Sequence, residues 1–339
     1  MSLISVPPLP TRLPRLPIAA RYRDAGLFVL LAALFGGGFV AIKTGLRELP
    51  PVLFASLRFD IGALALLGYV ALTRPLSVWL PQSRSDLAGI AVAGVFLVAL
   101  NNGLLFLGQA SISPAMASIM YGLNPVLSPV FAWWLLGDRL SWVGALGIGV
   151  ALGGMVIIVQ PSPGAVATAS GVGQLFVLGA GVAVALGSVL LQRIGPGMDR
   201  VPLTAWGMAA GAAVLHLISL AAGEPHTGLL DVAPATVVSL LVIGIPSTAI
   251  AYAIHFELLE RAGPVRANLV AYVVPVFAAL SGWLLLGTGV SGWTVVGFVV
   301  VVAGFALVER TTLREEVWRL RQRVRDPEPA PCPAPPCDD

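Results

Sequence analysis

Several polar side chains interrupt long apolar stretches of this sequence, where polar groups are expensive and are functional candidates by default. In the first half of the chain these are Lys43, Arg58, Asp60, Asn101, Asn102, Gln109, Tyr121 and Asn124. In the second half they are Trp206, His216, Tyr252, His255, Glu257, Asn268 and Tyr272. Amide, phenol and guanidinium groups hold polar molecules through hydrogen bonds and charge. The set therefore indicates a binding site for a small polar molecule.

We expect Asn101, Asn102, Tyr121 and Asn124 to form one wall of that site, with Arg58 setting the charge beside them. Tyr121 and Asn124 are three residues apart, so they share one face of a helix. Asn101 and Tyr121 lie at similar depth, because about seven residues separate each from the short turn between their two spans. The amides could instead only join neighbouring helices.

If those residues only join helices, Tyr252 and Tyr272 mark the alternative place for the site. Arg58 lies about six residues, or roughly 9 Å, from the outer end of its span. A guanidinium at this depth needs a partner or water, and we expect either an ion pair with a nearby carboxylate or an anionic group of the bound molecule. Asp60 lies on nearly the opposite helix face, so we do not expect it to pair with Arg58. Lys43 either reaches outward to the surface or lies beside the polar path.

The elements that must position these residues are membrane-spanning helices. The chain is 57% hydrophobic and only 11% charged, against about 25% charged residues in soluble domains. Because a spanning helix needs about 20 apolar residues, the sequence predicts ten spans: 26–46, 52–73, 87–108, 114–136, 141–160, 173–192, 203–222, 236–256, 266–286 and 291–309. Their continuous apolar character excludes a β-barrel. The predicted fold class is an all-α membrane protein.

The second half of the chain repeats the first at a constant offset. The matching pairs are Pro114 and Pro264, Ala117 and Ala267, Pro125 and Pro275, Trp133 and Trp283, Gly137 and Gly287, Ser141 and Ser291, Gly147 and Gly297, and Gly154 and Gly304. Five spans in the first half make the second half enter from the opposite side, so the two repeats are inverted. Inverted repeats are typical of secondary transporters, with the binding site near the midplane between them.

The mirrored depth of the polar residues agrees with this arrangement. In the first half all but Asp60 lie in the outer part of their spans, and in the second half all but His216 lie toward the inner part. We expect His216 to be packed or to face the lumen. His255 and Glu257 lie at the inner rim, where a surface role is the default.

Pro125 and Pro275 occupy equivalent positions in the two halves. A proline inside a helix removes a hydrogen bond and leaves the carbonyl four residues earlier without its donor. We therefore expect two bent helices that line the central cavity and flex during a conformational change. A fixed kink that serves only packing is the alternative.

Charge predicts the orientation of the chain in the membrane. With a cytoplasmic N-terminus, all of the 20 Lys and Arg residues fall on the cytoplasmic side except Lys43, Arg47 and Arg58. This positive-inside pattern places both termini in the cytoplasm. The basic excess is thus an orientation signal and does not indicate nucleic-acid binding. The expected partners are the lipid bilayer and a small-molecule substrate, and the sequence gives no indication of an oligomeric state.

The predicted organisation has five parts: a disordered basic leader over 1–25, the two repeats over 26–160 and 173–309, a linker over 161–172, and a tail over 310–339. The tail begins with a basic helix over 310–326, expected to rest on the membrane surface or to bind a partner, and ends in a Pro-rich segment. Both cysteines, Cys332 and Cys337, lie in this tail. A disulfide is not expected in the cytoplasm, so they are predicted to be free thiols.

Alternatives to transport are an intramembrane enzyme and a ligand-sensing membrane protein. No group of His, Asp and Glu has metal-ligand spacing, and no Cys or Ser–His pair on neighbouring spans presents itself as a nucleophile with its base. We therefore predict no catalytic residue, metal or cofactor. The absence of a phosphate-binding motif excludes direct use of ATP. Asp60 is the one central acid that could carry a proton, which leaves uniport and proton-coupled exchange both open.

Four sequence segments resemble the EamA-type family of the drug/metabolite transporter superfamily. They are Phe39–Lys43, Pro51–Phe59, Asn124–Ala132 and Gly137–Trp142. The resemblance covers roughly residues 26–309, in both halves of the chain. The resemblance implies ten helices in two inverted repeats, cytoplasmic termini, and export of amino acids or other small metabolites from the cell. The segment Gly137–Trp142 is a turn that contains the acidic–basic pair Asp138 and Arg139. In the second half Thr288 and Gly289 replace this pair, so we expect the family's turn features in the first half only.

Overall fold

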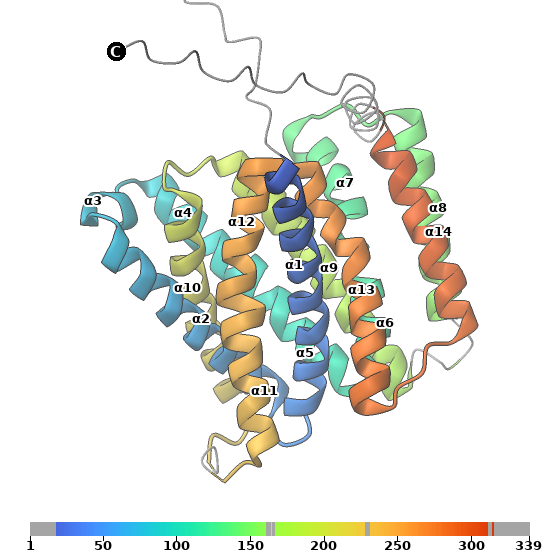
Figure 1. Cartoon of the computed structure of the whole chain (residues 1–339), viewed down its shortest axis with the longest axis horizontal. Coiled ribbons are helices and arrows are strands. Elements are labelled where there is room, and N and C mark those ends of the chain that lie inside the picture. The colour runs from blue at the N-terminus through green and yellow to red at the C-terminus, as the bar shows by residue number, and fades with distance from the viewer. Residues whose placement is uncertain are drawn as a thin grey trace, which may run out of the picture.

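The computed structural model describes residues 18–160, 164, 167–227, 231–262, 264–310 and 314, which form a helical bundle (Figure 1). No strand occurs among these residues. The first half contains α1 (Ile18–Gly45), α2 (Pro51–Thr73), α3 (Leu76–Trp79), α4 (Arg84–Val92), α5 (Asn101–Ser111), α6 (Pro114–Tyr121), α7 (Asn124–Leu136) and α8 (Trp142–Val159). The second half contains α9 (Ala169–Ile194), α10 (Arg200–Ala221), α11 (Pro234–Gly244), α12 (Ala251–Ala262), α13 (Pro264–Leu286) and α14 (Gly292–Val308).

Nine helical stretches in the described part of the chain are long and apolar enough to cross a membrane. A tenth apolar helix, α14, has 17 residues, somewhat fewer than the roughly 20 of a typical span. The first helix starts earlier than expected, at Ile18. Figure 1 shows that α1 begins and α14 ends at the same end of the bundle. The predicted all-α membrane fold is confirmed, with nine candidate spans and one shorter apolar helix among the described residues.

Parts of the predicted organisation lie outside the described residues. They are the leader before residue 18, part of the linker, and the tail with its two cysteines and nearly all of its basic helix.

A glycine and a serine build the same helix–turn–helix junction in both halves. Gly137 ends α7 and Gly287 ends α13, with left-handed φ values of 75° and 66° that suit glycine. Ser141 and Ser291 then cap α8 and α14 by accepting a hydrogen bond from the amide three residues ahead. The expectation that this turn belongs to the first half alone is wrong, because it depends on the glycine and serine rather than on the acidic–basic pair.

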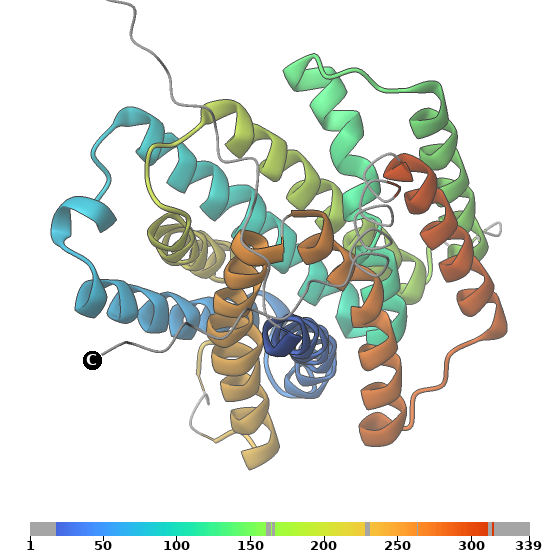
Figure 2. The same ribbon diagram turned by 45° about the horizontal axis from the view of Figure 1, so that its top comes forward.

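The helices of the two halves pack reciprocally. The first long helix of each half contacts the fourth span of the other half, so α1 packs on α13 and α9 packs on α7. The second spans, α2 and α10, contact each other. The last spans, α8 and α14, lie side by side at one edge of the bundle, as Figure 2 shows. This exchange of equivalent partners is the pattern expected of a duplicated chain.

The third span of each half contains a π-helical segment. Ala93–Leu100 connects α4 with α5, and Ile245–Ile250 connects α11 with α12. A π-helical stretch widens the helix and leaves backbone carbonyls available to side chains, and it often marks a functional site. Both segments approach the polar residues described below.

The fourth spans of the two halves differ from each other. In the first half the span breaks at Gly122 and Leu123, and Pro125 lies in the first turn of α7, where an amide donor is not needed. In the second half α13 continues through Pro275. The two matching prolines therefore lie in different local structures: one half has a break and the other a continuous helix that contains a proline.

Two loop glutamates join the halves, because each caps a helix of the other half. Glu48, after α1, accepts hydrogen bonds from the Ala233 amide (2.9 Å) and the Thr236 hydroxyl (2.7 Å) at the start of α11. Glu224, after α10, accepts from two backbone amides in the first turn of α2 (3.0 and 2.8 Å). The hydrogen bond from Thr236 and, to a smaller extent, that from Ala233 lower the pKa of Glu48, so its carboxylate stays ionised at neutral pH.

Candidate functional site

Arg58 is the centre of a polar cluster inside the bundle. It projects from α2 and is only 8% exposed. Its Nε atom donates to the Thr248 hydroxyl (2.8 Å) and its Nη1 atom to the Asn102 side-chain oxygen (3.2 Å). The rings of Phe59 and Phe106 lie 4.9 and 5.9 Å from the guanidinium carbon. A cation therefore lies in the bundle interior between neutral oxygens and aromatic rings.

Arg58 takes part in none of the ion pairs found among the described residues. Its two hydrogen-bond acceptors are neutral, and a guanidinium has five N–H donors. A buried charge without a counter-charge is unfavourable by several kcal/mol, on the order of the desolvation penalty of one ion. The described residues thus provide no carboxylate partner for Arg58.

Asn101 and Asn102 connect the cluster to the first π-helical segment. The Asn102 amide nitrogen donates to the carbonyls of Leu97 and Val98 (3.2 and 3.1 Å), while its oxygen accepts from Arg58. The Asn101 nitrogen donates to the Leu97 carbonyl and to the Tyr121 hydroxyl, each at 3.1 Å. The Asn101 side-chain oxygen is buried and has no partner among the described residues. The two amides therefore join helices and also leave one acceptor unused.

Thr248 is the contribution of the second π-helical segment, and the sequence reasoning missed it. Its hydroxyl accepts from Arg58 and donates to the Ile243 carbonyl (2.7 Å), five residues earlier. Pro246, two residues before it in an apolar span, is the sequence signal that could have drawn attention to this segment. Arg58 thereby connects the π-helical regions of the two halves.

Two tyrosines lie within the electrostatic range of the guanidinium. Tyr121 packs edge-on against Phe39 (centroids 6.3 Å apart), and Tyr252 packs edge-on against Phe35 (6.1 Å). Phe35 and Phe39 are one turn apart on α1. The cluster thus has a charged centre, amide groups on one side and aromatic rings around it.

The structure brings together only part of the predicted set. Arg58, Asn101, Asn102, Tyr121 and Tyr252 belong to the cluster. Two other predicted residues contact different neighbours: the Asn124 carbonyl accepts from Ser128 (3.2 Å), and the Tyr272 ring packs on Phe305 with centroids 4.3 Å apart.

Asp60 and His216, the two residues that break the mirrored depth pattern, pair with each other. The Asp60 carboxylate lies 2.8 Å from His216 Nε2, and Ser56 Oγ lies 3.3 Å from His216 Nδ1. Ser56 and His216 thus form a Ser–His pair on neighbouring spans that the sequence did not reveal. The Ser56 side chain is fully buried, however, and its hydroxyl donates to the Leu53 carbonyl. It is therefore poorly placed to act as a nucleophile.

Lys43 has a structural role that neither interpretation of the sequence included. Its ammonium donates to the backbone carbonyls of Gln109 and Ala110 (2.8 and 2.9 Å) at the end of α5. Cations stabilise helix C-termini in this way, because the last carbonyls have no intrahelical donor. At the opposite end of the bundle, Glu257 pairs with Arg23 (2.5 Å), which agrees with its expected surface role.

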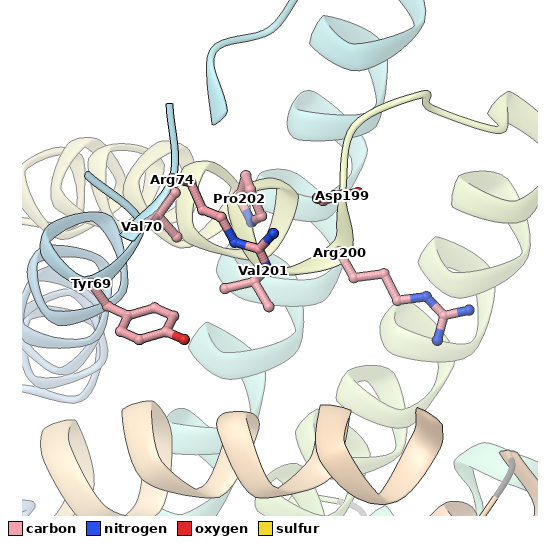
Figure 3. A pocket seen from close by; sticks show the side chains of 7 residues that line it. All are labelled: Tyr69, Val70, Arg74, Asp199, Arg200, Val201 and Pro202. Carbon is pink, nitrogen blue, oxygen red and sulfur yellow. The ribbon is translucent and has the colours of Figure 1, made fainter. Parts of the chain in front are cut away.

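A surface pocket of about 300 Å³ lies apart from the cluster, between the end of α2 and the start of α10 (Figure 3). Its lining residues are Tyr69, Val70, Arg74, Asp199, Arg200, Val201 and Pro202. Tyr69 is about three helical turns from Arg58 along α2. The pocket is therefore a feature of the rim and does not contain the central polar cluster.

Comparison with known proteins identifies the family. The sequence matches the EamA-like transporter family over residues 25–160 and again over residues 171–310. The chain belongs to this family. The family comprises transporters, so the chain is a multi-pass membrane protein of a transporter family and not an enzyme.

Several relatives extend over most of the chain. An "Uncharacterized transporter" of Archaeoglobus fulgidus is 28% identical and covers 84% of this chain and 98% of its own length. The "Uncharacterized inner membrane transporter YedA" of Escherichia coli K12 is 27% identical, with 79% and 83% covered. The "WAT1-related protein At3g02690, chloroplastic" of Arabidopsis thaliana is 25% identical, with 83% and 68% covered.

A protein of known crystal structure has the same fold. It superposes with a TM-score of 0.57 at 22% identity and covers 86% of this chain and 97% of the other.

Proposed function

We propose that this protein is a secondary transporter that exports a small polar metabolite, an amino acid or a related compound, across the cytoplasmic membrane by alternating access. The observation that carries the proposal is the Arg58 cluster, which is buried in the bundle and formed by both halves of the chain. A site between two repeats can be exposed to either side of the membrane when the repeats move against each other. The membership in a transporter family and the reciprocal helix packing support this interpretation.

The direct test is a flux assay with the purified protein in liposomes. Radiolabelled amino acids and related metabolites are screened with and without a pH gradient across the membrane. Saturable uptake of at least one compound is expected, and protein-free liposomes serve as the control. Specific binding of a compound without any flux would instead favour a sensor, which is the competing function.

The pH-gradient arm of that assay distinguishes uniport from proton-coupled exchange. We propose the Asp60–His216 pair as the proton site if coupling is found, because an acid and a base lie there 2.8 Å apart. The variant Asp60→Asn should then remove the effect of the pH gradient while counterflow of the substrate continues.

We propose that both termini are cytoplasmic and that the two five-helix repeats are inverted, because positive charge gathers on one side of the predicted spans. A reporter that is active only in the cytoplasm, fused after Arg325, should give a signal. A reporter that requires the periplasm should be inactive at the same position. The reverse result would contradict the span count and the inversion of the repeats with it.

We propose that Pro125 and Pro275 serve conformational exchange, and that Pro275 has the larger role. Alanine at position 275 would restore a hydrogen bond to the Ala271 carbonyl and stiffen α13. Gly122, at the break between α6 and α7, lies beside that carbonyl: a Cβ built on it would be 3.7 Å away.

Pro275→Ala is therefore expected to keep or raise the melting temperature and to lower flux by roughly tenfold, about 1.4 kcal/mol in the exchange barrier. Pro125→Ala is the matched comparison and should change flux less, because no helix hydrogen bond is restored there. Normal flux in Pro275→Ala would show that the proline serves packing only.

We propose that Asn101, Asn102 and Tyr121 contact the substrate. Each contact contributes on the order of 1 kcal/mol, so single Ala substitutions should weaken apparent affinity by roughly three- to tenfold. Asn124→Ala is the matched comparison, since the Asn124 side-chain oxygen lies 3.5 Å from Ser128 Oγ, one turn along its own helix. The measurement is the concentration dependence of uptake, with the amount of folded protein determined by size exclusion. Unchanged affinity in all of the variants would mean that these groups only join helices.

A further inference from the structure

We infer that the substrate is a small carboxylate that has no free ammonium group to balance its charge. This inference rests on the proposed function and narrows its substrate class. It starts from the charge of the site: Arg58 is buried, its two acceptors are the neutral oxygens of Thr248 and Asn102, and the nearby side chains are aromatic or amide groups. The site therefore carries one positive charge before a substrate enters.

The described carboxylates closest to Arg58 along the chain, or joined to its helix, are engaged elsewhere. Asp60, two residues along α2, pairs with His216 at 2.8 Å. Glu224 caps the first turn of α2 through two backbone amides, and its second oxygen also accepts from Ser219 (2.7 Å). A zwitterionic amino acid would bring an ammonium group near the guanidinium without an acid to receive it. A net anion neutralises the site instead.

The geometry of Arg58 suits a carboxylate. A guanidinium presents its donors in a planar fork that matches the two oxygens of a carboxylate. Thr248 accepts from Nε and Asn102 from Nη1 of Arg58, and these two acceptors come from different halves of the chain. These two contacts fix the orientation of the fork, and three of its five N–H donors are not used by them.

The Asn101 side chain indicates which second polar group the substrate carries. The Asn101 side-chain oxygen is buried and has no hydrogen-bond partner among the described residues, while the nitrogen of the same amide donates to Tyr121. A buried acceptor is satisfied by a neutral donor such as a hydroxyl group. The structure thus favours a hydroxylated carboxylate, and the surrounding Phe and Tyr rings provide apolar surface for its carbon skeleton.

The test compares pairs of probes that differ in one group. Lactate and alanine, and phenyllactate and phenylalanine, each exchange a hydroxyl for an ammonium at the same carbon. Counterflow into liposomes that contain the purified protein gives an apparent affinity for each compound. In at least one pair the hydroxy acid should bind roughly tenfold or more tightly than its amino acid, because like charges repel in the bundle interior.

Variants at position 58 connect the preference to the guanidinium. Arg58→Gln should lower the affinity for the hydroxy acid by roughly 10- to 100-fold. Arg58→Lys keeps the charge but loses the planar fork, so it should bind more weakly than wild type and still prefer the hydroxy acid. Arg47→Gln removes an exposed charge from the outer loop after α1 and should behave as wild type. Melting temperatures show whether each variant is folded.

The possible outcomes separate this inference from the proposed function. Preference for the amino acid in both pairs, or unchanged hydroxy-acid affinity in folded Arg58→Gln, would overturn the inference and leave transport intact. If none of the four probes moves, the inference is wrong, and the broader metabolite screen then decides whether the transport proposal stands. If that screen is also negative, both fail.

Discussion

Replacing Gly304 with valine is expected to destabilise the folded protein strongly. Gly304 lies on α14 where it meets α8, and a Cβ at this position would be 2.5 Å from the Ala151 nitrogen and 2.6 Å from the Gly147 carbonyl oxygen. Both atoms belong to the backbone, so the neighbouring helix itself would have to move. In membranes, small residues allow helices to approach this closely and gain packing energy. The loss should be about 3 kcal/mol or more.

The chain offers a matched control one residue from an equivalent contact. A Cβ on Gly154 of α8 would lie 2.8 Å from the Gly297 carbonyl oxygen, whereas a Cβ on the adjacent Gly153 has no atom within 4 Å. Melting temperatures in detergent should therefore fall steeply for Gly304→Val and Gly154→Val and remain near wild type for Gly153→Val. Equal melting temperatures in the three variants would contradict the packing of α8 against α14.

Arg58→Met is expected to abolish transport while leaving the protein at least nearly as stable as wild type. A buried charge contributes little net stability, and apolar residues of similar volume often replace such a charge without loss. Methionine fits the space beside Phe59 and Phe106, because it is unbranched and packs well against aromatic rings. Without the guanidinium, an anionic substrate would lose its counter-charge, and flux should fall by roughly 100-fold.

The opposite experiment removes the acceptors and keeps the charge. Thr248→Val combined with Asn102→Leu would leave Arg58 buried without either of its acceptors, which should destabilise the fold by about 3–5 kcal/mol. Adding Arg58→Met to this double variant should restore much of the melting temperature. If Arg58→Met alone unfolds the protein, or if the triple variant is no more stable than the double, Arg58 is a structural residue and not a substrate-binding one.

Most of the helices and turns could be predicted from the sequence, because they depend on local sequence patterns. Apolar runs separated by short turns predicted the helices, since each span must satisfy its own backbone hydrogen bonds. The repeated spacing of Gly137 with Ser141, and of Gly287 with Ser291, corresponds to real turns in both halves. The weaker predictions depended on how far a helix continues. Matching prolines accompany a break at Gly122 in one half and an unbroken α13 in the other, so the proline alone does not decide which of the two forms.

The site was predictable only in part, because its contacts join residues from distant spans. Arg58 and Asn102 could be selected as polar residues at membrane depth, but their contact depends on how α2 rotates toward α5. Thr248 was overlooked, since a threonine in an apolar span has a small polar group and satisfies it through its own helix. Asp60 and His216 were each noticed as exceptions to the depth pattern. Only the packing of α2 on α10 brings them together.

The central claim is that the Arg58 cluster binds the transported solute. Equilibrium binding of a radiolabelled compound that wild-type liposomes transport, measured on purified protein in detergent, tests this claim without requiring a complete transport cycle. Wild type and Gly153→Val should bind the compound saturably at one site, whereas folded Arg58→Met should bind at least roughly 100-fold more weakly. Equal affinity in folded Arg58→Met and wild type would show that the substrate binds elsewhere in the bundle.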